Sequence, residues 1–133
     1  MNDGMTEILF QKAVPILRIF DTRKAKEFYV GFLGFTIDWE YGSAEDSPVY
    51  MQVSRESLIL HLTEHHGDCC PGARIFIEMT GIHQLHQEIT SKGYKYMSPG
   101  IEKTFYNAKC MEVTDPFGNR LTFNESLKSD NHV

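Results

Sequence analysis

The chain has 133 residues, of which 41% are hydrophobic and 12% aromatic, a composition that can bury a core and excludes a disordered chain. Its 18 acidic and 13 basic residues give a net charge of −5, which argues against a nucleic-acid-binding protein, because such proteins carry a basic surface. The start of the chain lacks signal-peptide features, no apolar run is long enough to span a membrane, and three cysteines do not make a disulfide framework. We expect one cytoplasmic domain over residues 1–133.

The first half of the chain predicts one helix among four strands. Asp21 can cap a helix whose apolar stripe is formed by Ala25, Phe28, Tyr29, Phe32 and Leu33, and Gly34 suits the left-handed position that ends it. The strands are expected at residues 13–20, 35–41, 49–53 and 58–63.

The second half predicts the same order of elements after a polar loop over residues 64–72. Ile82, Leu85 and Ile89 place one apolar stripe on a helix that Gly93 closes. The turn Asp115-Pro116-Phe117-Gly118-Asn119 joins the last two strands into a hairpin. Strands are expected at residues 74–79, 94–97, 107–114 and 120–124, with a long connection over 98–106.

The two halves match in pattern at an offset of about 60 residues. Leu17 corresponds to Ile77, Tyr29 to Ile89, and Gly34 to Gly93 at an offset one residue shorter. Self-similarity at a fixed period indicates a duplicated unit. We therefore predict two βαβββ modules, at about residues 13–63 and 73–125, that need each other for stability.

These features resemble the glyoxalase, bleomycin-resistance and extradiol-dioxygenase superfamily, the vicinal oxygen chelate proteins. The resemblance is carried by the paired modules, by Glu27-Phe28-Tyr29 with Leu33-Gly34-Phe35, and by the 115–119 turn before the last strand. The run from Leu60 to Asp68 resembles bleomycin-resistance-like members. The resemblance implies an α+β fold in which two tandem βαβββ modules form a curved mixed sheet around a pocket, commonly in a homodimer.

In the metal enzymes of this superfamily, four ligands come from the first and last strands of the two modules. The resemblance places those positions at Val14, His61, Arg74 and Thr122, of which only His61 is a good ligand for a divalent metal. A chain with this set is expected to bind no metal and to need no cofactor, as in the binding branch of the family.

Alternation along the strands gives the face on which a ligand would lie. The predicted pocket residues are Arg18, Trp39, His61, Arg74, Phe76, Glu78, Tyr106, Cys110, Glu112 and Thr122. Other interpretations stay open: His61 can satisfy a buried hydrogen bond, Arg74 can pair structurally with Glu78 or Glu112, and Trp39 can belong to the core. The loop with His65-His66, Asp68 and Cys69-Cys70 suits either a metal cluster or a solvated turn.

The leading hypothesis is a non-catalytic protein that sequesters a cationic or aromatic small molecule of the bleomycin type. The alternatives are a metal-dependent glyoxalase-like lyase or transferase and, last, a metal-free enzyme that uses His61 as a base. We expect no nucleic-acid or membrane partner. A homodimer is predicted, because Phe20, Phe28, Tyr29 and Phe32 exceed what a small core needs and suggest a subunit contact.

Overall fold

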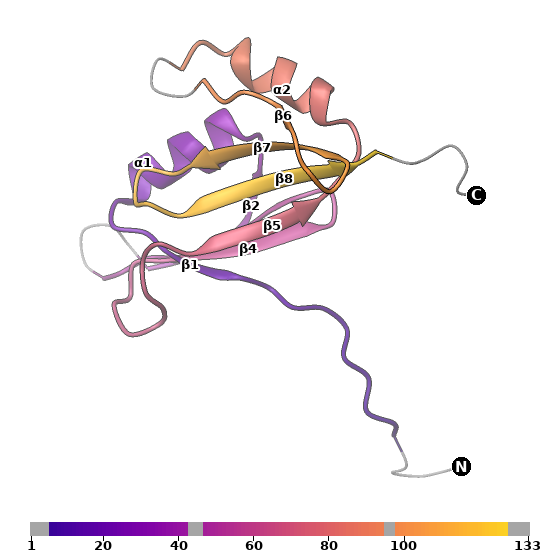
Figure 1. The fold of residues 1–133 in the computed structure, drawn as a ribbon. Coiled ribbons are helices and arrows are strands. Elements are labelled where there is room, and N and C mark those ends of the chain that lie inside the picture. Colours follow the sequence, from indigo (N-terminus) through magenta and orange to yellow (C-terminus); the bar gives the residue numbers. More distant parts are fainter. Residues whose placement is uncertain (1–5, 43–46, 95–97, 128–133) are drawn as a thin grey trace.

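The computed structural model describes residues 6–42, 47–94 and 98–127, which form two four-stranded sheets and their covering helices (Figure 1). Sheet A has the strand order β1 (Ile16–Arg18), β4 (Leu58–Thr63), β3 (Tyr50–Arg55), β2 (Thr36–Tyr41), and sheet B has the order β5 (Arg74–Glu78), β8 (Arg120–Ser126), β7 (Ala108–Thr114), β6 (Glu102–Lys103). In each sheet the first pair of strands is parallel and the other pairs are antiparallel. The predicted α+β fold with two tandem modules is confirmed.

The first helix starts as predicted but widens in its second half. Asp21 caps α1 (Thr22–Lys26), with its Oδ1 accepting from the backbone N–H of Lys24 at 3.0 Å. The chain continues without a break into a π-helix, η1 (Glu27–Phe32), and then ends at Gly34, whose φ of +76° is the left-handed conformation expected there. The apolar spacing predicted a helix but did not distinguish its π-helical half.

The second helix, α2 (Ile82–Thr90), packs its predicted stripe against β7 and β8. Ile82 and Ile89 are fully buried. At the start of the helix, Oε1 of Glu125 accepts from the backbone N–H groups of Gly81 and Ile82, at 3.0 and 2.9 Å. A side chain of the last strand therefore caps this helix, which is a tertiary contact that local sequence does not reveal.

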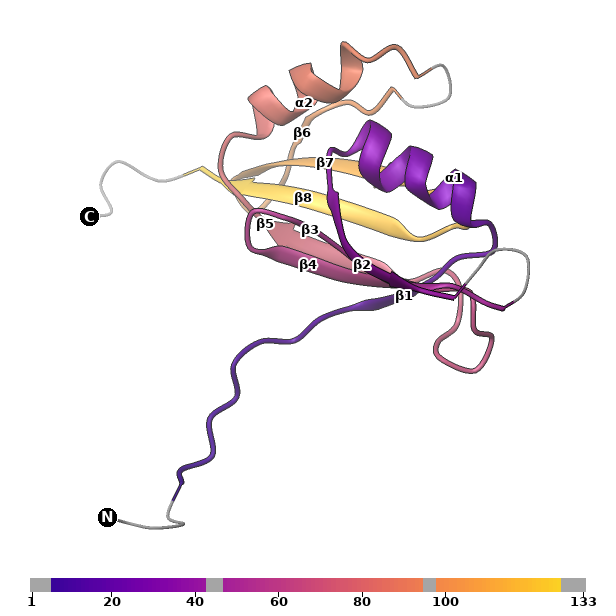
Figure 2. The same ribbon diagram turned by 180° about the vertical axis from the view of Figure 1, so that it is seen from behind.

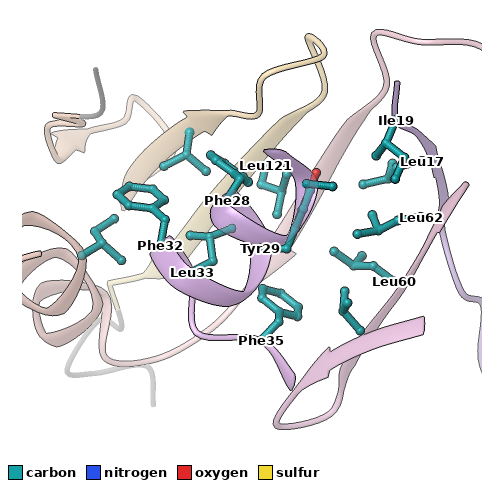
Figure 3. Packing of buried hydrophobic residues seen from close by; sticks show 14 of the residues in the cluster. Leu17, Ile19, Phe28, Tyr29, Phe32, Leu33, Phe35, Leu60, Leu62 and Leu121 are labelled. Carbon is teal, nitrogen blue, oxygen red and sulfur yellow. The ribbon is translucent and has the colours of Figure 1, made fainter. Parts of the chain in front are cut away.

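One hydrophobic core serves both modules, and the first helix supplies its largest side chains. Figure 3 shows Phe28, Tyr29 and Phe32 in this core, with Phe28 beside Leu121 of β8 and Tyr29 between Leu121 and the leucines of β4. Their exposed fractions are 2%, 0% and 0%. These aromatic residues are therefore not surplus to the core, and the argument that placed them at a subunit contact was wrong for all but Phe20, which is 55% exposed.

Hydrogen bonds also join the modules. The Tyr29 hydroxyl donates to Asp115 at 2.7 Å, and the Asn119 amide donates to the backbone oxygen of Arg18 at 2.8 Å. Across the other end of the core, Arg55 forms a bidentate pair with Glu88, with both N–O distances at 2.9 Å. The turn of the last hairpin is thus fixed against the first strand and the first helix.

Several predicted strands differ in extent. Residues 95–97 of the strand expected at 94–97 lie outside the described part of the chain, while the two-residue strand β6 occurs inside the connection expected over 98–106. Strand β1 is shorter than predicted, because the chain before Pro15 leaves the sheet and extends away from the body of the molecule (Figures 1 and 2). Among the described residues, no helix is long and apolar enough to cross a membrane.

Candidate functional site

Each sheet has a face turned away from the shared core, here called its open face. On the open face of sheet A lie Arg18, Trp39, Tyr41, Tyr50, Gln52 and His61, and on that of sheet B lie Arg74, Phe76, Glu78, Cys110, Glu112, Arg120, Thr122 and Asn124. The pairing register places Gln52 opposite His61, and Glu112 opposite Thr122. The alternation predicted for β4, β5, β7 and β8 is therefore the observed one.

An aromatic cluster covers the open face of sheet A. The rings of Trp39 and Tyr50 are stacked, with an interplanar angle of 6° and centroids 6.0 Å apart. Tyr41 lies 5.2 Å from Trp39, and the His61 ring meets Trp39 edge-on at 5.1 Å. Because Tyr41 is 67% exposed and Trp39 is only half-buried, the cluster presents ring surface to solvent.

A β-bulge in β2 puts Trp39 on this face. The register between β2 and β3 shifts between Ile37 and Trp39, so that Ile37 packs against the core while both Asp38 and Trp39 lie on the open side. Regular alternation would have put Ile37 and Trp39 on the same face. The tryptophan therefore belongs to the open face and not to the core.

A chain of hydrogen bonds fixes the tautomer of the neutral His61 ring. The amide nitrogen of Gln52 donates to Asp38 at 3.0 Å. The amide oxygen of Gln52 lies 2.9 Å from Nε2 of His61 and can only accept, so Nε2 carries a proton and donates to it. Nδ1 of His61 is then unprotonated and accepts from the Tyr50 hydroxyl at 2.8 Å. This assignment follows from the carboxylate of Asp38, which can only accept when it is ionised.

The pKa values agree with this pattern. Burial lowers the pKa of His61, which favours the neutral ring. The hydrogen bonds from Gln52 and Ser54 lower the pKa of Asp38, which keeps that carboxylate ionised. Burial raises the pKa of Tyr50, so its hydroxyl stays a donor. His61 is thus a neutral residue whose two ring nitrogens are both occupied, and it is not placed as a free base.

Arg18 lies at the edge of this face, beside the loop that follows β4. Its guanidinium carbon is 4.5 Å from the centre of the Phe20 ring, and its Nη1 is buried without a hydrogen-bond acceptor among the described residues. The loop closes on itself through Thr63, whose hydroxyl donates to Asp68 at 2.7 Å. Burial raises the pKa of Cys69 there, which makes this thiol a poor nucleophile or metal ligand.

The open face of sheet B carries a charged network around Glu112. The Thr122 hydroxyl donates to Glu112 at 2.9 Å and accepts from Nε of Arg74 at 3.2 Å. Nη2 of Arg74 is 3.5 Å from Oε1 of Glu112, and Nη1 of Arg120 is 3.9 Å from Oε2 of Glu112. Two guanidinium groups therefore share one carboxylate on a half-exposed surface.

The other predicted residues of sheet B surround this network. Phe76 is 53% exposed, and Tyr106 covers Asn124, to whose side-chain oxygen it donates at 3.0 Å. Burial raises the pKa of Cys110, which makes its thiol a poor nucleophile. Glu78 is exposed at the end of β5, opposite Asn124.

The predicted pocket residues thus form two groups on two sheets. Arg18, Trp39 and His61 lie on sheet A, whereas the others lie on sheet B or, for Tyr106, in the connection beside it. No hydrogen bond, ion pair or ring contact among the described residues joins the two groups. Within the described part of one chain, Glu112 and Arg74 therefore make no such contact with His61.

The metal-ligand positions implied by the superfamily do not fit a metal ion. Both nitrogens of His61 are hydrogen-bonded, Arg74 is a cation, Val14 has no side-chain donor, and the Thr122 hydroxyl is engaged by Glu112 and Arg74. Within the described part of the chain, no group of three or more His, Cys, Asp or Glu side chains is arranged to hold a metal. The metal cluster considered for the His65–Cys70 loop is therefore not formed there.

Two cavities lie along the seam between the modules, and their linings reach Phe76 and Glu78 on the open face of sheet B. The larger, of about 540 Å³, is bounded by the β3–β4 turn, the end of β5 and the start of α2. The smaller, of about 330 Å³, runs from residues 12–15 along the start of β4 and β5. Of the predicted pocket residues, only Phe76 and Glu78 line either of them.

Sequence reasoning missed Tyr50, Gln52 and Asp38, which together hold His61 and the aromatic cluster. The first two could have been found from the hairpin, because a two-residue turn at Glu56–Ser57 pairs Gln52 with His61. The third depends on the bulge, for which the sequence carries no evident signal.

Comparison with known proteins gives the family. A family model described as glyoxalase superfamily protein matches residues 2–130. The bleomycin resistance protein of Geobacillus stearothermophilus is 25% identical over 134 residues, covering 89% of this chain and 98% of that protein.

Solved structures agree. A bleomycin-binding protein complexed with bleomycin gives a TM-score of 0.70 at 19% identity, covering 89% of this chain and 100% of that one. The bleomycin-binding protein from bleomycin-producing Streptomyces verticillus, complexed with copper(II)-bleomycin, gives 0.65 at 25% identity, covering 92% and 100%. The chain belongs to the glyoxalase superfamily, and its similarities place it with the bleomycin-resistance-like branch.

Proposed function

We propose that this protein sequesters a small organic ligand of the bleomycin type, cationic and bearing planar rings, without metal chemistry of its own. The observation that carries the proposal is the half-exposed aromatic cluster of Trp39, Tyr41 and Tyr50. A rigid ring surface binds planar groups with little loss of side-chain entropy. Relatives named as bleomycin resistance and bleomycin-binding proteins support the choice of ligand class.

The hydrogen-bond chain behind the cluster supports binding rather than catalysis. Asp38, Gln52, His61 and Tyr50 satisfy one another and hold the rings in place. A general base needs a free lone pair within reach of a substrate proton, and His61 has none in this arrangement. The net charge of −5 favours a cationic ligand.

The site is proposed to be completed in a homodimer, in which the open face of sheet A in one copy meets the open face of sheet B in its partner. Neither seam cavity is lined by the aromatic cluster of sheet A or by the Glu112 network of sheet B, and Arg18 keeps a buried N–H that a ligand or a partner would satisfy. Closed two-fold dimers are the commonest soluble assembly, and they would give two identical sites.

The chain offers a direct assay, because Trp39 is its only tryptophan. Titration with metal-free bleomycin and with copper(II)-bleomycin should quench the tryptophan fluorescence and release heat in calorimetry with one ligand per chain. Mass spectrometry of the released ligand should return it unchanged. Absence of both quenching and heat with either form would remove this ligand class, and a modified product would establish an enzyme instead.

A matched pair of variants tests the ring surface. Trp39→Leu should weaken binding about 10-fold, because one stacking contact contributes roughly 0.5–1.5 kcal/mol beyond buried area. Trp39→Phe keeps an aromatic ring and should bind within about 3-fold of the parent by calorimetry. Equal loss in the two variants would contradict stacking as the source of affinity.

Mixing two defective chains tests the shared site. In a heterodimer of Trp39→Leu and Glu112→Ala, one site combines both defects and the other combines two intact faces. Mixing should therefore restore full affinity at one site per heterodimer. No restoration, with heterodimer formation verified by two different tags, would place each site within a single chain.

A further inference from the structure

The Tyr50 hydroxyl lies at one end of the hydrogen-bond chain behind the aromatic cluster. Its single proton is directed to the unprotonated Nδ1 of His61, at 2.8 Å. No other hydrogen bond to this hydroxyl occurs among the described residues. The lone pairs of the phenolic oxygen are therefore unfilled, and toward a ligand this hydroxyl can accept a hydrogen bond but cannot donate one.

The direction of this hydrogen bond is decided at the other end of the chain, by Asp38. Its ionised carboxylate can only accept, so it orients the Gln52 amide with the nitrogen toward Asp38, at 3.0 Å. The amide oxygen then faces Nε2 of His61 at 2.9 Å and holds the ring proton on that nitrogen. Each group in the chain could point either way by itself, and each is fixed by the group before it.

The β-bulge in β2 places the orienting carboxylate next to the stacking ring. Asp38 and Trp39 are consecutive residues on the open side of β2, where regular alternation would have separated them. Trp39 is stacked with Tyr50 at an interplanar angle of 6°, and the exposed Tyr41 is directly opposite Tyr50 in the pairing of β2 with β3. A planar ligand on the exposed rings of this cluster therefore lies beside the Tyr50 hydroxyl.

The electrostatic surroundings of this hydroxyl favour a ligand group that donates. Burial raises the pKa of Tyr50, and the charge of the Asp68 carboxylate raises it further, so Asp68 makes the potential at the phenolic oxygen more negative. Negative potential stabilises a hydrogen-bond donor, and a cationic donor most of all. An N–H group of an amidinium, a guanidinium or an amino-substituted aromatic ring meets both requirements.

We propose that Asp38 is a positioning residue that sets the hydrogen-bond polarity of the open face of sheet A. Acting through Gln52 and His61, it holds the Tyr50 proton inward, so that this face selects planar ligands that carry an N–H donor over those that carry only an acceptor. Stacking by itself makes no such distinction, because donor and acceptor rings present similar faces. The inference rests on the proposed function and names the ligand group that the ring surface recognises.

Nitrogen-15 NMR of the histidine rings at pH 8 tests the orientation without a ligand, with the His61 signals assigned by comparison with His61→Gln. In the parent, Nε2 should carry the proton and Nδ1 should be unprotonated. In Asp38→Asn the new amide can either accept from Gln52 or donate to it, so both tautomers should become populated. A parent ring protonated at Nδ1, or an unchanged tautomer in Asp38→Asn, would overturn the proposal.

Ser54→Ala is the matched control for Asp38→Asn. The Ser54 hydroxyl donates to Asp38 at 3.0 Å but lies outside the chain that leads to Tyr50. Its removal takes one hydrogen bond from Asp38 and keeps the carboxylate, so the His61 ring should show the parent tautomer.

Two neutral bicyclic probes test the selectivity. Indole offers a ring N–H donor, whereas quinoline offers only an acceptor nitrogen, and the shift of the ring N–H signal of Trp39, the only tryptophan, reports the binding of each. The parent and Ser54→Ala should bind indole about 5-fold more tightly than quinoline, as one neutral hydrogen bond provides. In Asp38→Asn and in Tyr50→Phe the two affinities should agree within about 2-fold. No preference in the parent, a preference that survives Tyr50→Phe, or no binding of either probe would contradict the inference.

These outcomes are separate from those of the bleomycin assay. If bleomycin binds but the parent does not discriminate between indole and quinoline, the proposed function stands and this inference is wrong. If the probes are discriminated as expected but bleomycin gives neither quenching nor heat, the polarity of the face stands and the bleomycin class is removed.

Discussion

Tyr29→Phe removes one hydroxyl from the most buried polar contact between the two modules. The ring is fully buried, and its hydroxyl donates to Oδ2 of Asp115 at 2.7 Å. Asp115 also accepts from the backbone N–H groups of Phe117 and Asn119 and from the Asn119 amide, at 2.9, 2.8 and 2.8 Å. Burial, with the nearby carboxylate, raises the pKa of Tyr29 well above its ordinary value, so the hydroxyl remains a donor at neutral pH.

The magnitude follows from the charge of the acceptor. A hydrogen bond to a charged group contributes roughly 1.5–3 kcal/mol, against about 1 kcal/mol for a neutral pair. Three of the four hydrogen bonds to Asp115 remain in the variant, so the buried carboxylate still has donors. We expect Tyr29→Phe to lower the free energy of unfolding by about 2 kcal/mol without changing the fold.

Urea unfolding at pH 7, followed by circular dichroism at a fixed protein concentration, measures this loss. Tyr106→Phe is the matched control, because its hydroxyl donates to the neutral Asn124 oxygen at 3.0 Å and its side chain is 48% exposed. That control should cost about 0.5 kcal/mol. If the two variants lose the same stability, the buried charge of Asp115 does not stabilise the contact between modules.

Three further predictions concern the seam and the site. Gly34→Ala should lower the free energy of unfolding, measured with urea, by about 1 kcal/mol more than Gly93→Ala does. Both glycines have φ near +75°, but of the two only Gly34 would place a Cβ against Arg55, at 3.0 Å. The pKa of His61 in the folded chain is lowered from 6.5, so on acidification the unfolded chain takes up this proton first. The contribution of neutral His61 to stability should therefore be complete above pH 6.5 and fall as the pH drops below it. His61→Gln should flatten that part of a plot of the urea-derived free energy of unfolding against pH. Arg55→Lys should lower the free energy of unfolding by about 1 kcal/mol at low salt, since the ion pair with Glu88 is a third exposed. The loss should be smaller in 1 M salt, because the Debye length there is roughly 3 Å, about the length of the ion pair.

The behaviour of His61 shows how a site residue depends on its neighbours. From sequence it is a candidate ligand-binding, metal-binding or structural residue and, as the last alternative, a catalytic base. Its partners on β3 and the bulge in β2 decide among these, because an ionised Asp38 orients Gln52 and thereby fixes which nitrogen carries the proton. The hypothesis of a metal-free enzyme with His61 as base loses its support for the same reason.

Local sequence determined the order of elements and the faces of the strands. The cap at Asp21, the glycines that end the helices and the period-two alternation of the last hairpin each depend on neighbouring residues only. The repeat of these signals after about 60 residues, together with the 115–119 turn, was enough to identify the fold and its superfamily.

Tertiary structure decided everything that depends on how the two modules meet. The π-helix forms where Phe28, Tyr29 and Phe32 all enter one shared core, and packing energy there outweighs local helix preference. The same packing separates the predicted pocket residues onto two open faces. Sequence periodicity assigns each side chain to one of the two faces of its strand. Which way the open face points is decided in three dimensions, because the other face packs against the shared core.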